Sequence, residues 1–463
     1  MQELFDHIHF IGVGGVGMSG IARVLAEQGK KVSGSDLKKS GITSGLEKLG
    51  AVIFEGHAAE NLPQETEIVV VSSAIREDNP EVVEAKKRNL PIWQRAKMLA
   101  YLMRQKSGIA VAGAHGKTTT SSMIATILEK NAFDPTVVIG GIVNDLGINA
   151  KLGQGDYLVA EADESDGSMV NLLPLATVVT NIEDDHLDHY GTVENIRAAF
   201  VQYINQLPDN GFALLCWDDA NIHLIKDKLS SRCLTYGINN EADYMAKDIA
   251  FAKLGSSFTV WQRGRNLGTI KLKIPGLHNV YNALAAAGVC LEIGMPFARI
   301  SQVLADFKGV QRRFQLIGNL DAETMVVDDY AHHPTEIKAV LQAARNGWQG
   351  RLIAVFQPHR YTRTQLLYQE FMQAFDAVDL LLMNTIYAAS EDPIEGVSAE
   401  KLARDIAEAK GKEVLFFAEK EEIVDYLAAN FASGDLIVTV GAGDVCQIGP
   451  CLLEKCLGRK ANG

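Results

Sequence analysis

A short glycine-rich segment carries residue types that bind nucleotide phosphates. Residues 113–118 read Gly-Ala-His-Gly-Lys-Thr and lie between an apolar stretch and a longer apolar-periodic one. Glycines let backbone N–H groups face an anion, and the N-terminus of a following helix adds partial positive charge. Lys117 can reach β- and γ-phosphates, and the Thr118 hydroxyl can bind Mg²⁺. The spacing is G-x-x-G-K-T, with Val111 where the longer Walker pattern has its first glycine. The strand before it and the helix after it favour a phosphate loop.

Carboxylates follow two further apolar runs of the same region. Residues 161–166 read Glu-Ala-Asp-Glu-Ser-Asp, and residues 183–188 contain His186 among acidic residues. Several carboxylates at a strand end are electrostatically costly unless a cation offsets them. Beside a phosphate loop, Glu161 and His186 therefore predict two divalent ions that bridge phosphate oxygens.

A second glycine turn lies near the N-terminus. Residues 12–17 read Gly-Val-Gly-Gly-Val-Gly after an apolar strand, and the next strand ends at Asp36. This is the dinucleotide-binding fingerprint, which alone indicates an NAD-dependent oxidoreductase, but the same turn holds any pyrophosphate. The phosphate loop downstream favours a second nucleotide instead. Ser72 and Ser73 end another strand of this region, where they are either ligand contacts or an ordinary turn.

Basic side chains follow a strand in the last third of the chain. Residues 352–356 form an apolar run that ends in Gln-Pro-His-Arg-Tyr-Thr-Arg-Thr. His359, Arg360 and Arg363 are adjacent donors that can hold a carboxylate bidentately, although an exposed, solvated arginine pair is the alternative. Another run, residues 325–327, leads into Asp-Asp-Tyr-Ala-His-His-Pro.

Two asparagines open an alanine-rich helix in the middle of the chain. Asn279 and Asn282 follow a Pro-Gly pair and precede residues 283–287. Asn279 is expected either to cap the helix or, with Asn282, to contact adenine or phosphate.

Alternation of strands and helices along the chain predicts an α/β fold of three domains. Residues 1–106 are expected to form a Rossmann-like domain, and residues 107–309 a P-loop ATPase domain. The ATPase domain should have a mostly parallel sheet plus a small antiparallel one, because residues 256–274 alternate polar and apolar. Residues 310–463 are expected to form a second Rossmann-like domain with polar groups at its strand ends.

Composition excludes several classes of protein. The 463 residues are enough for more than one domain, and the formal net charge of −13 argues against nucleic-acid binding. No apolar run is long enough for membrane insertion, and the N-terminus lacks the features of a signal peptide. The six cysteines form no C-x-x-C pair and indicate free thiols in a reducing cytoplasm.

Taken together, these motifs resemble the Mur ligases of peptidoglycan synthesis over nearly the whole chain. The resemblance is carried by the residues 12–20, 114–120, 161–166, 180–186, 328–336 and 357–364. The last of these, Q-P-H-R-Y-T-R-T, is most similar to the members that add alanine. The resemblance implies three small-molecule substrates, UDP-N-acetylmuramate, ATP and L-alanine, bound by the first, second and third domains, with Mg²⁺ as cofactor. The first glycine turn would then hold a UDP diphosphate rather than NAD.

The resemblance also implies roles for individual residues. Lys117, Glu161, His186, Arg313 and Asp329 would be catalytic, and Thr118, Glu161 and His186 would bind metal. The remaining implied contacts are, for ATP, Gly113, His115, Gly116, Thr119, Asn279 and Asn282; for the UDP substrate, Gly14, Gly15, Gly17, Asp36, Ser72 and Ser73; and for the amino acid, Tyr330, His332, His359, Arg360 and Arg363. Several relatives carry a carbamylated lysine after the metal histidine, but residues 190–206 contain no lysine.

The implied reaction agrees with the residue types. A carboxylate is a poor electrophile, so ATP would first convert the lactyl carboxylate to an acyl phosphate, which the amine of L-alanine attacks. Cations must offset the charge on the phosphoryl oxygens. The alternatives are a murein-peptide ligase or another amino-acid ligase on the same scaffold, an NAD-dependent oxidoreductase, and a non-enzymatic nucleotide-binding regulator.

Overall fold

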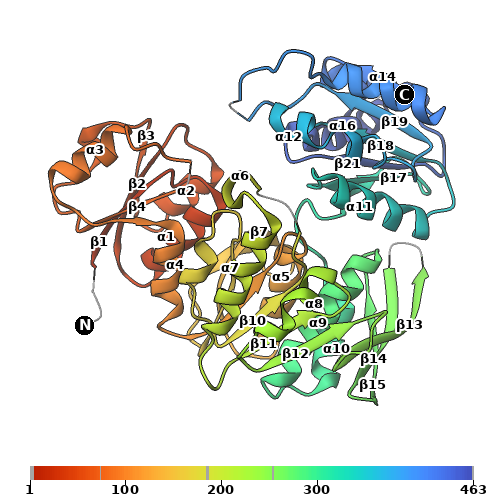
Figure 1. Cartoon of the computed structure of the whole chain (residues 1–463). Helices are drawn as coiled ribbons and strands as arrows, with labels where there is room; N and C mark the ends of the chain where they lie inside the picture. The colour runs from red at the N-terminus through yellow and green to blue at the C-terminus, as the bar shows by residue number, and fades with distance from the viewer. Residues whose placement is uncertain (1–4, 73, 184–186, 253–254, 390, 461–463) are drawn as a thin grey trace. The chain divides into compact units, whose positions relative to one another are not determined.

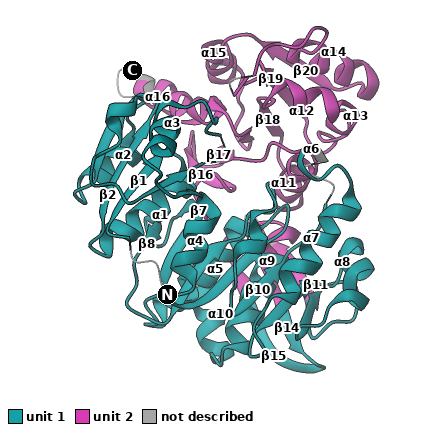
Figure 2. Ribbon diagram, turned by 60° about the vertical axis from the view of Figure 1, so that its left-hand side comes forward, with its two compact units in different colours: residues 1–247, 259–270, 281–307 teal, residues 248–258, 271–280, 308–463 magenta. Residues whose placement is uncertain are grey.

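Three β-sheets, each accompanied by helices, make up the chain in the computed structural model, which describes residues 5–72, 74–183, 187–252, 255–389 and 391–460 (Figure 1). The α/β class and the three-domain organisation predicted from the sequence are confirmed. Contacts between residues group the chain into two units (Figure 2). One contains residues 1–247, 259–270 and 281–307, and the other contains residues 248–258, 271–280 and 308–463.

The first sheet has five parallel strands in the order β3-β2-β1-β4-β5. The order reverses beside β1, and ligands of such sheets bind at this point, at the carboxyl ends of the strands. The glycine turn and Asp36 lie at those ends. In chain order the elements are β1 (His7–Ile11), α1 (Val16–Glu27), β2 (Lys31–Asp36), α2 (Gly41–Glu47), β3 (Val52–Glu55), η1 (Ala59–Asn61), β4 (Ile68–Val71), α3 (Pro80–Lys87), β5 (Ile92–Gln94) and α4 (Arg95–Met103).

The second sheet has ten strands in the order β15-β14-β13-β12-β11-β10-β6-β9-β7-β8. The strands around the phosphate loop, β10, β6 and β9, pair in parallel. The elements are β6 (Ser107–Ala112), α5 (Lys117–Lys130), β7 (Thr136–Val143), β8 (Ile148–Lys151), β9 (Tyr157–Glu161), η2 (Ser168–Asn171), β10 (Ala176–Val179), α6 (Leu187–Tyr190), α7 (Val193–Asn205), β11 (Phe212–Cys216), α8 (Ala220–Ile225), η3 (Lys226–Lys228), β12 (Cys233–Gly237), β13 (Tyr244–Ala252), β14 (Gly255–Gln262), β15 (Arg265–Leu272), α9 (Leu277–Glu292) and α10 (Phe297–Asp306).

The alternating strands expected near residues 256–274 join this large sheet instead of forming a sheet of their own. β14 and β15 are separated only by Arg263 and Gly264, both of which have positive φ. A two-residue connection of this kind makes a tight hairpin. β13 pairs in parallel with β12 through Tyr236 and Tyr244, so the hairpin continues the sheet.

The third sheet has six strands in the order β16-β17-β21-β18-β19-β20, and only the edge strand β16 runs antiparallel to its neighbour. Separate clusters of buried apolar side chains cover its two faces, which explains why its inner strands are continuous apolar runs. The elements are β16 (Gln315–Asn319), β17 (Met325–Asp329), α11 (Pro334–Gly347), β18 (Leu352–Phe356), α12 (Tyr361–Leu366), α13 (Tyr368–Phe371), β19 (Leu380–Asn384), α14 (Ala399–Lys410), β20 (Glu413–Phe417), α15 (Lys420–Asn430), β21 (Leu436–Val440), η4 (Asp444–Gln447) and α16 (Ile448–Lys460).

Helix α1 connects the first two sheets within one unit. It packs on β2 of its own sheet and on β7 and β8 of the second sheet. Gly20 makes this possible, because a Cβ there would lie 3.2 Å from the Cβ of Ala150 and 3.5 Å from Val138. Polar contacts lie at both ends of the helix, since Asn149 donates to the Val16 carbonyl and the Leu152 N–H donates to Glu27.

Two expectations about the whole chain concern membranes and thiols. Among the described residues, no helix is both long and apolar enough to cross a membrane. All six cysteines are free thiols.

Candidate functional site

The phosphate loop joins β6 to α5 and is held by the strand end beside it. Gly113 and Gly116 have φ of 126° and 84°, which favour glycine. The side chains of Thr180 and Asn181, which follow β10, both donate to the His115 carbonyl, and the Asn181 Oδ1 accepts from the His115 N–H. The neighbouring strand end therefore fixes the middle of the loop.

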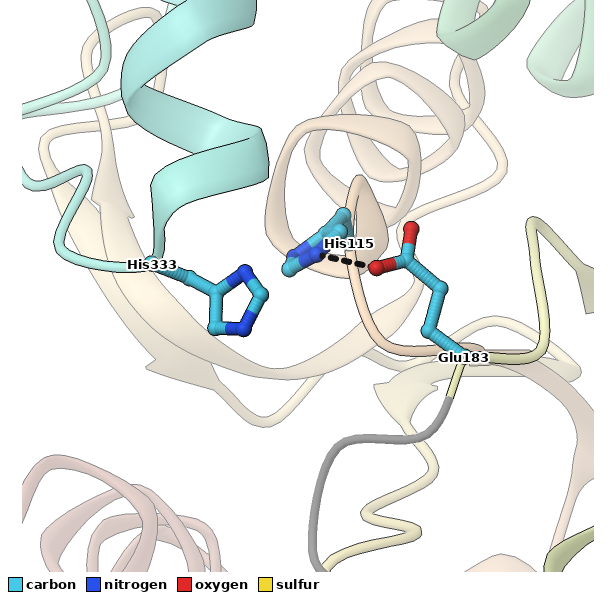
Figure 3. A group of neighbouring side chains, drawn as sticks. All are labelled: His115, Glu183 and His333. Carbon is cyan, nitrogen blue, oxygen red and sulfur yellow. Dashed lines mark hydrogen bonds and ion pairs between the residues drawn. The ribbon is translucent and has the colours of Figure 1, made fainter. Parts of the chain in front are cut away.

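Side chains of the loop and of the first turn of α5 also have hydrogen-bond partners. Figure 3 shows His115 and Glu183 pointing toward one another, with 3.2 Å between Nε2 and Oε2. Thr119 is buried in the first turn of α5, and next to it the Thr120 hydroxyl donates to Oδ1 of Asn282. Asn282, from α9, thus lies at the phosphate loop, where a Cβ on Gly116 would come within 2.7 Å of its Oδ1.

Lys117 does not extend into solvent. Its Nζ donates to the carbonyls of Gly113 and Ala114 at 2.5 and 3.2 Å and to Oε1 of Glu164 at 2.9 Å. Burial lowers the pKa of this lysine, but the carboxylates of Glu164, Glu161 and Asp163 outweigh burial and raise it overall. The ammonium therefore stays charged. The sequence did not predict Glu164 as its partner.

The acidic segment after β9 presents three carboxylates in three different settings. Glu161 accepts the Gly140 N–H at 2.6 Å and is partly exposed. Asp163 pairs with Arg95 of α4 at 2.6 Å, whereas Glu164 is buried against Lys117. The other predicted metal ligand, His186, lies outside the described residues.

The N-terminal glycine turn is tied to the strand that follows it. Oδ2 of Asp36 accepts the Gly14 N–H at 2.8 Å, and the Gly12 N–H donates to the Ser35 carbonyl. A Cβ on Gly12 would lie 3.2 Å from the Ser72 hydroxyl, which brings the end of β4 to the turn. Gly15 caps α1, as the anion-binding reading of residues 12–17 requires. Ser73 lies outside the described residues.

An unpredicted cation, Arg95, also lies at this turn. A Cβ on Gly17 would be 3.2 Å from its Nη1, while its Nη2 pairs with Asp163. The guanidinium therefore lies between the glycine turn of the first sheet and the acidic segment of the second. No motif marks Arg95 in the sequence, because its contacts lie 68 or more positions away.

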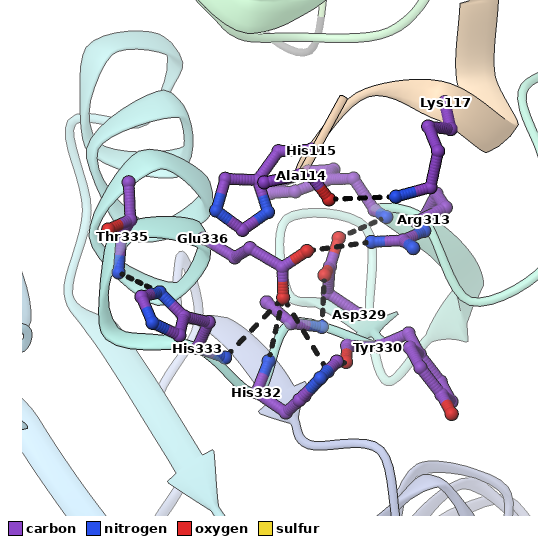
Figure 4. A network of polar contacts seen from close by, with 12 residues as sticks. Ala114, His115, Lys117, Arg313, Asp329, Tyr330, His332, His333, Thr335 and Glu336 are labelled. Atoms are coloured by element: carbon purple, nitrogen blue, oxygen red, sulfur yellow. Dashed lines mark hydrogen bonds and ion pairs between the residues drawn. The ribbon is translucent and has the colours of Figure 1, made fainter. Parts of the chain in front are cut away.

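In the other unit, a polar network surrounds the end of β17 (Figure 4). Glu336 of α11 accepts the backbone N–H groups of His332 and His333, and its other oxygen lies 3.7 Å from Arg313. Asp329 is buried and accepts the N–H groups of Phe314 and Ala331. Burial raises the pKa of Asp329 to about 6, although Arg313 and both N–H groups oppose the rise.

The two adjacent arginines have different partners. Arg312 donates to the buried carboxylate of Asp328 and to the carbonyls of Gly441 and Gly443, so it joins β17 to the loop after β21. Arg313 instead lies beside Glu336, and both guanidinium groups lie over the ring of Tyr330. The structure thus separates a structural arginine from one within the polar network.

The predicted amino-acid pocket residues gather in this unit as well. The rings of His332 and His359 are 5.8 Å apart, and His359 stacks on Tyr387. Arg363 lies 3.3 Å from Nδ1 of His359, whereas Arg360 is exposed and has φ of 72°. Burial and the neighbouring His332 and arginines lower the pKa of His359 to about 4, so its ring is neutral at pH 7.

Asn279 does not cap its helix. α9 already begins at Leu277, and the side chain of Asn279 donates to the Pro275 carbonyl at 2.6 Å. The capping interpretation is wrong because the helix starts earlier than the alanine-rich stretch. Contact of Asn279 with adenine or phosphate stays a prediction.

Comparisons with known proteins give three family matches that follow one another along the chain. Residues 7–107 match a model described as the Mur ligase family catalytic domain, residues 111–290 the Mur ligase middle domain, and residues 312–443 the Mur ligase glutamate ligase domain. The chain is 51% identical to a UDP-N-acetylmuramate--L-alanine ligase of Geotalea uraniireducens, covering 99% of this chain and 100% of that one. A ligase of the same name from Syntrophotalea carbinolica is 52% identical, covering 96% and 97%.

Solved structures give the same picture. The UDP-N-acetylmuramate-alanine ligase of Thermotoga maritima superposes with a TM-score of 0.83 at 30% identity, covering 98% of this chain and 99% of that one. A murein peptide ligase of Psychrobacter arcticus gives 0.71 at 26% identity, covering 98% of both. Since relatives with 51% identity match from end to end and three family models follow one another along the sequence, the chain belongs to the Mur ligase family.

Proposed function

We propose that this protein ligates L-alanine to the lactyl carboxylate of UDP-N-acetylmuramate, with conversion of ATP to ADP and phosphate. The observation that carries the proposal is the full-length match, at 51% identity, to ligases named for this reaction. The murein-peptide alternative is not favoured, because the peptide ligase structure is less similar in both sequence and fold. Membership of the family also accounts for the glycine turn without NAD.

We assign one substrate to each of the three predicted domains. Residues 1–106 would bind the UDP substrate, residues 107–309 ATP, and residues 310–463 the amino acid. The glycine turn supports the first assignment, because Gly14, Gly15 and Gly17 lie at the N-terminus of α1, where backbone N–H groups favour a diphosphate. Asp36 and the strand-end serines would complete that subsite.

Several groups in the second part would act on ATP. The loop N–H groups from Gly113 to Thr119 would cradle the phosphates, and Lys117 would offset charge on the transferred phosphoryl group. Asn282 lies at the loop and would orient the nucleotide, and we assign Asn279 to the same subsite. Arg313 and Asp329 of the third part would add ATP contacts.

Thr118 and Glu161 fit Mg²⁺, because a hydroxyl and a carboxylate are the hard oxygen ligands that this ion prefers. Glu161 uses Oε1 to accept one N–H and is partly exposed, so its carboxylate has capacity for a cation. When bound, Mg²⁺ would neutralise phosphate charge and orient the triphosphate. We propose a second ion near His186; its other ligands must differ from those of relatives that use a carbamylated lysine.

The amino-acid pocket would consist of Tyr330, His332, His359, Arg360 and Arg363. A guanidinium fork matches the carboxylate of alanine, and the neutral His359, whose Nδ1 accepts from Arg363, has an Nε2–H that can donate to an oxygen of the substrate. The amine must be unprotonated when it attacks the acyl phosphate, whose phosphate then leaves. The aromatic rings around His359 restrict the space available to a side chain.

The test is phosphate release from ATP in the presence of Mg²⁺ and UDP-N-acetylmuramate, with each standard L-amino acid and the murein tripeptide added in turn. We expect release that requires both the sugar nucleotide and L-alanine, and a product heavier than the sugar nucleotide by one alanine residue. Release with the murein tripeptide or another amino acid would keep the scaffold and overturn the substrate. Release that ignores the sugar nucleotide would overturn the proposal as a whole.

A further inference from the structure

The contacts of Lys117 account for all of the hydrogen-bonding capacity of its ammonium group. The group has three N–H donors, and its three acceptors are the carbonyls of Gly113 and Ala114 and the carboxylate of Glu164. Figure 4 shows the side chain turned toward its own loop at Ala114. For Lys117 to donate to a phosphate, at least one of these contacts must break.

Glu164 is the only charged group among the three acceptors, and its position is fixed. The residue is 4% exposed. Its backbone carbonyl accepts the hydroxyl of Tyr190 at 2.7 Å, and the preceding residue, Asp163, is held by Arg95. Glu164 is thus a buried carboxyl group that the protein holds 2.9 Å from the ammonium; burial raises its pKa, and the charge of Lys117 opposes that rise.

Neither the predicted metal ligands nor the phosphate-loop motif requires a carboxylate at Glu164. Glu161, three positions earlier, instead accepts the Gly140 N–H. A charge-assisted hydrogen bond to a carboxylate is similar in length and strength to one with a phosphate oxygen. A buried carboxylate beside the phosphate-binding lysine is therefore a competitor of the nucleotide.

We propose that Glu164 is a positioning residue. In the nucleotide-free enzyme its carboxylate accepts the Lys117 hydrogen bond that a phosphate oxygen accepts when nucleotide is bound, and it forms this bond again when the product leaves. This inference rests on one part of the proposed function, that the enzyme binds ATP and releases ADP. Its consequence is that Glu164 weakens nucleotide binding. ADP, which lacks the γ-phosphate, competes less well with the carboxylate than ATP does, so Glu164 promotes product release.

The informative variant is Glu164→Gln. It keeps the size of the side chain and one acceptor oxygen for Lys117 but removes the charge. The matched control is Asp166→Asn, which makes the same charge change two positions away. Asp166 is exposed and its Oδ1 accepts the Ser168 N–H, a contact that the amide oxygen of asparagine can keep.

The measurement is the dissociation constant of ADP, ATP and AMP by calorimetry, without metal, sugar nucleotide or alanine. We expect Glu164→Gln to bind ADP about tenfold more tightly, which corresponds to about 1.4 kcal/mol. AMP binding should not change, because AMP has no β-phosphate for Lys117. Asp166→Asn should match the wild type for all three. Unchanged or weaker ADP binding by folded Glu164→Gln overturns the proposal, as does equal tightening of AMP or equal tightening in Asp166→Asn.

Glu164→Asp keeps the inference testable if the glutamine variant does not fold. It retains the charge but withdraws the carboxylate by one methylene, so ADP should bind more tightly than to the wild type, by about threefold. No tightening would overturn the proposal. In a Lys117→Met background, Glu164→Gln should have no effect on ADP affinity, because the competing pair is gone, and a persisting effect would contradict the role of Lys117.

The two proposals fail in different ways. Ligation of an amine other than L-alanine would overturn the proposed substrate and leave the ADP shift in Glu164→Gln intact. An unchanged ADP affinity in that variant would overturn the role of Glu164 while alanine ligation stands.

Discussion

At the scale of single residues, the main finding is that charged groups of the site are paired with one another. Lys117 pairs with Glu164, Arg95 with Asp163, and Arg313 lies near Glu336. Each pair joins a group whose chemistry suits an anionic substrate to a carboxylate from another element. Removing one member of a buried pair leaves the other uncompensated, so such variants should affect stability as well as activity.

Lys117→Ala should show both effects. We expect ligation to fall by at least about a thousandfold, because a donor to the transferred phosphoryl group is lost. The free energy of unfolding should fall by about 2 kcal/mol, since the buried Glu164 loses its cation. Denaturant titration checks the second value, and adding Glu164→Gln should restore part of it. Binding of UDP-N-acetylmuramate should stay within about twofold of the wild type; equal loss of binding and ligation would contradict the division into domains.

His278 should make stability depend on pH. Burial, with a smaller contribution from Arg313, lowers the pKa of His278 to about 4 in the folded protein, against 6.5 for an ordinary histidine. Because the unfolded chain binds the proton more readily, the stability present above pH 6.5 is lost as pH falls toward 4. The loss from this residue amounts to at most about 3 kcal/mol.

Unfolding titrations between pH 7 and pH 4.5 measure this slope. His278→Gln should flatten it relative to the wild type, whatever the variant does to stability at neutral pH. His189→Gln, a control at an exposed imidazole, should keep the wild-type slope. A wild-type slope in His278→Gln would show that other groups carry the pH dependence.

At the scale of elements, the phosphate loop depends on backbone conformation. A Cβ at Gly113 would lie 2.2 Å from the Thr180 hydroxyl, at a φ of 126°. Gly113→Ala should therefore displace either the loop or the end of β10, lower the free energy of unfolding by about 1–3 kcal/mol and weaken ATP binding at least tenfold. Gly41→Ala in α2 is the control, because a Cβ there meets nothing within 4 Å. Thermal unfolding and ATP titration distinguish the two, and equal behaviour would contradict the close packing at Gly113.

Most elements could be predicted from the sequence, because apolar runs bounded by glycine or charge specify buried strands. β4 and β18 begin and end where the apolar runs do. β10 is shorter than the run 176–182, because Thr180 and Asn181 leave the strand to bind the His115 backbone. Periodicity does not reveal such a tertiary contact.

The site was predictable to the extent that its residues cluster in the sequence. Lys117, Glu161, Asp329 and His359 stand in short motifs. The structure puts the first three at a helix start or strand end and His359 between β18 and α12. Arg95 and Glu336 belong to the site because they contact Asp163 and Arg313 of other elements. Since these contacts are distant in the sequence, no motif identifies either residue. Glu164 stood inside a recognised motif, but its pairing with Lys117 depends on how β9 lies beside β6.

At the scale of the whole molecule, the first sheet and most of the second lie in one unit, and Arg95 and Asp163 are a polar contact between these two sheets. The pair is partly exposed, so we expect a coupling of about 0.5–1 kcal/mol between Arg95→Met and Asp163→Asn in a double-mutant cycle. Unfolding free energies of the wild type, both single variants and the double variant give this value. A control cycle of Arg95→Met with Asp166→Asn should give none. No coupling in the first cycle would mean that the contact contributes nothing to the unit.

The packing of α1 on both sheets has a consequence for recombination between relatives. A chimaera that exchanged only residues 1–106 would bring in a foreign α1 opposite the resident β7 and β8, where Gly20 and Ala150 leave no room for a larger side chain. Exchange of α1 together with the β7–β8 hairpin would keep the matching surfaces in one parent. The crossover points that preserve this packing therefore differ from the predicted boundary at residue 106, and we expect chimaeras built on that boundary to disrupt the contacts of α1.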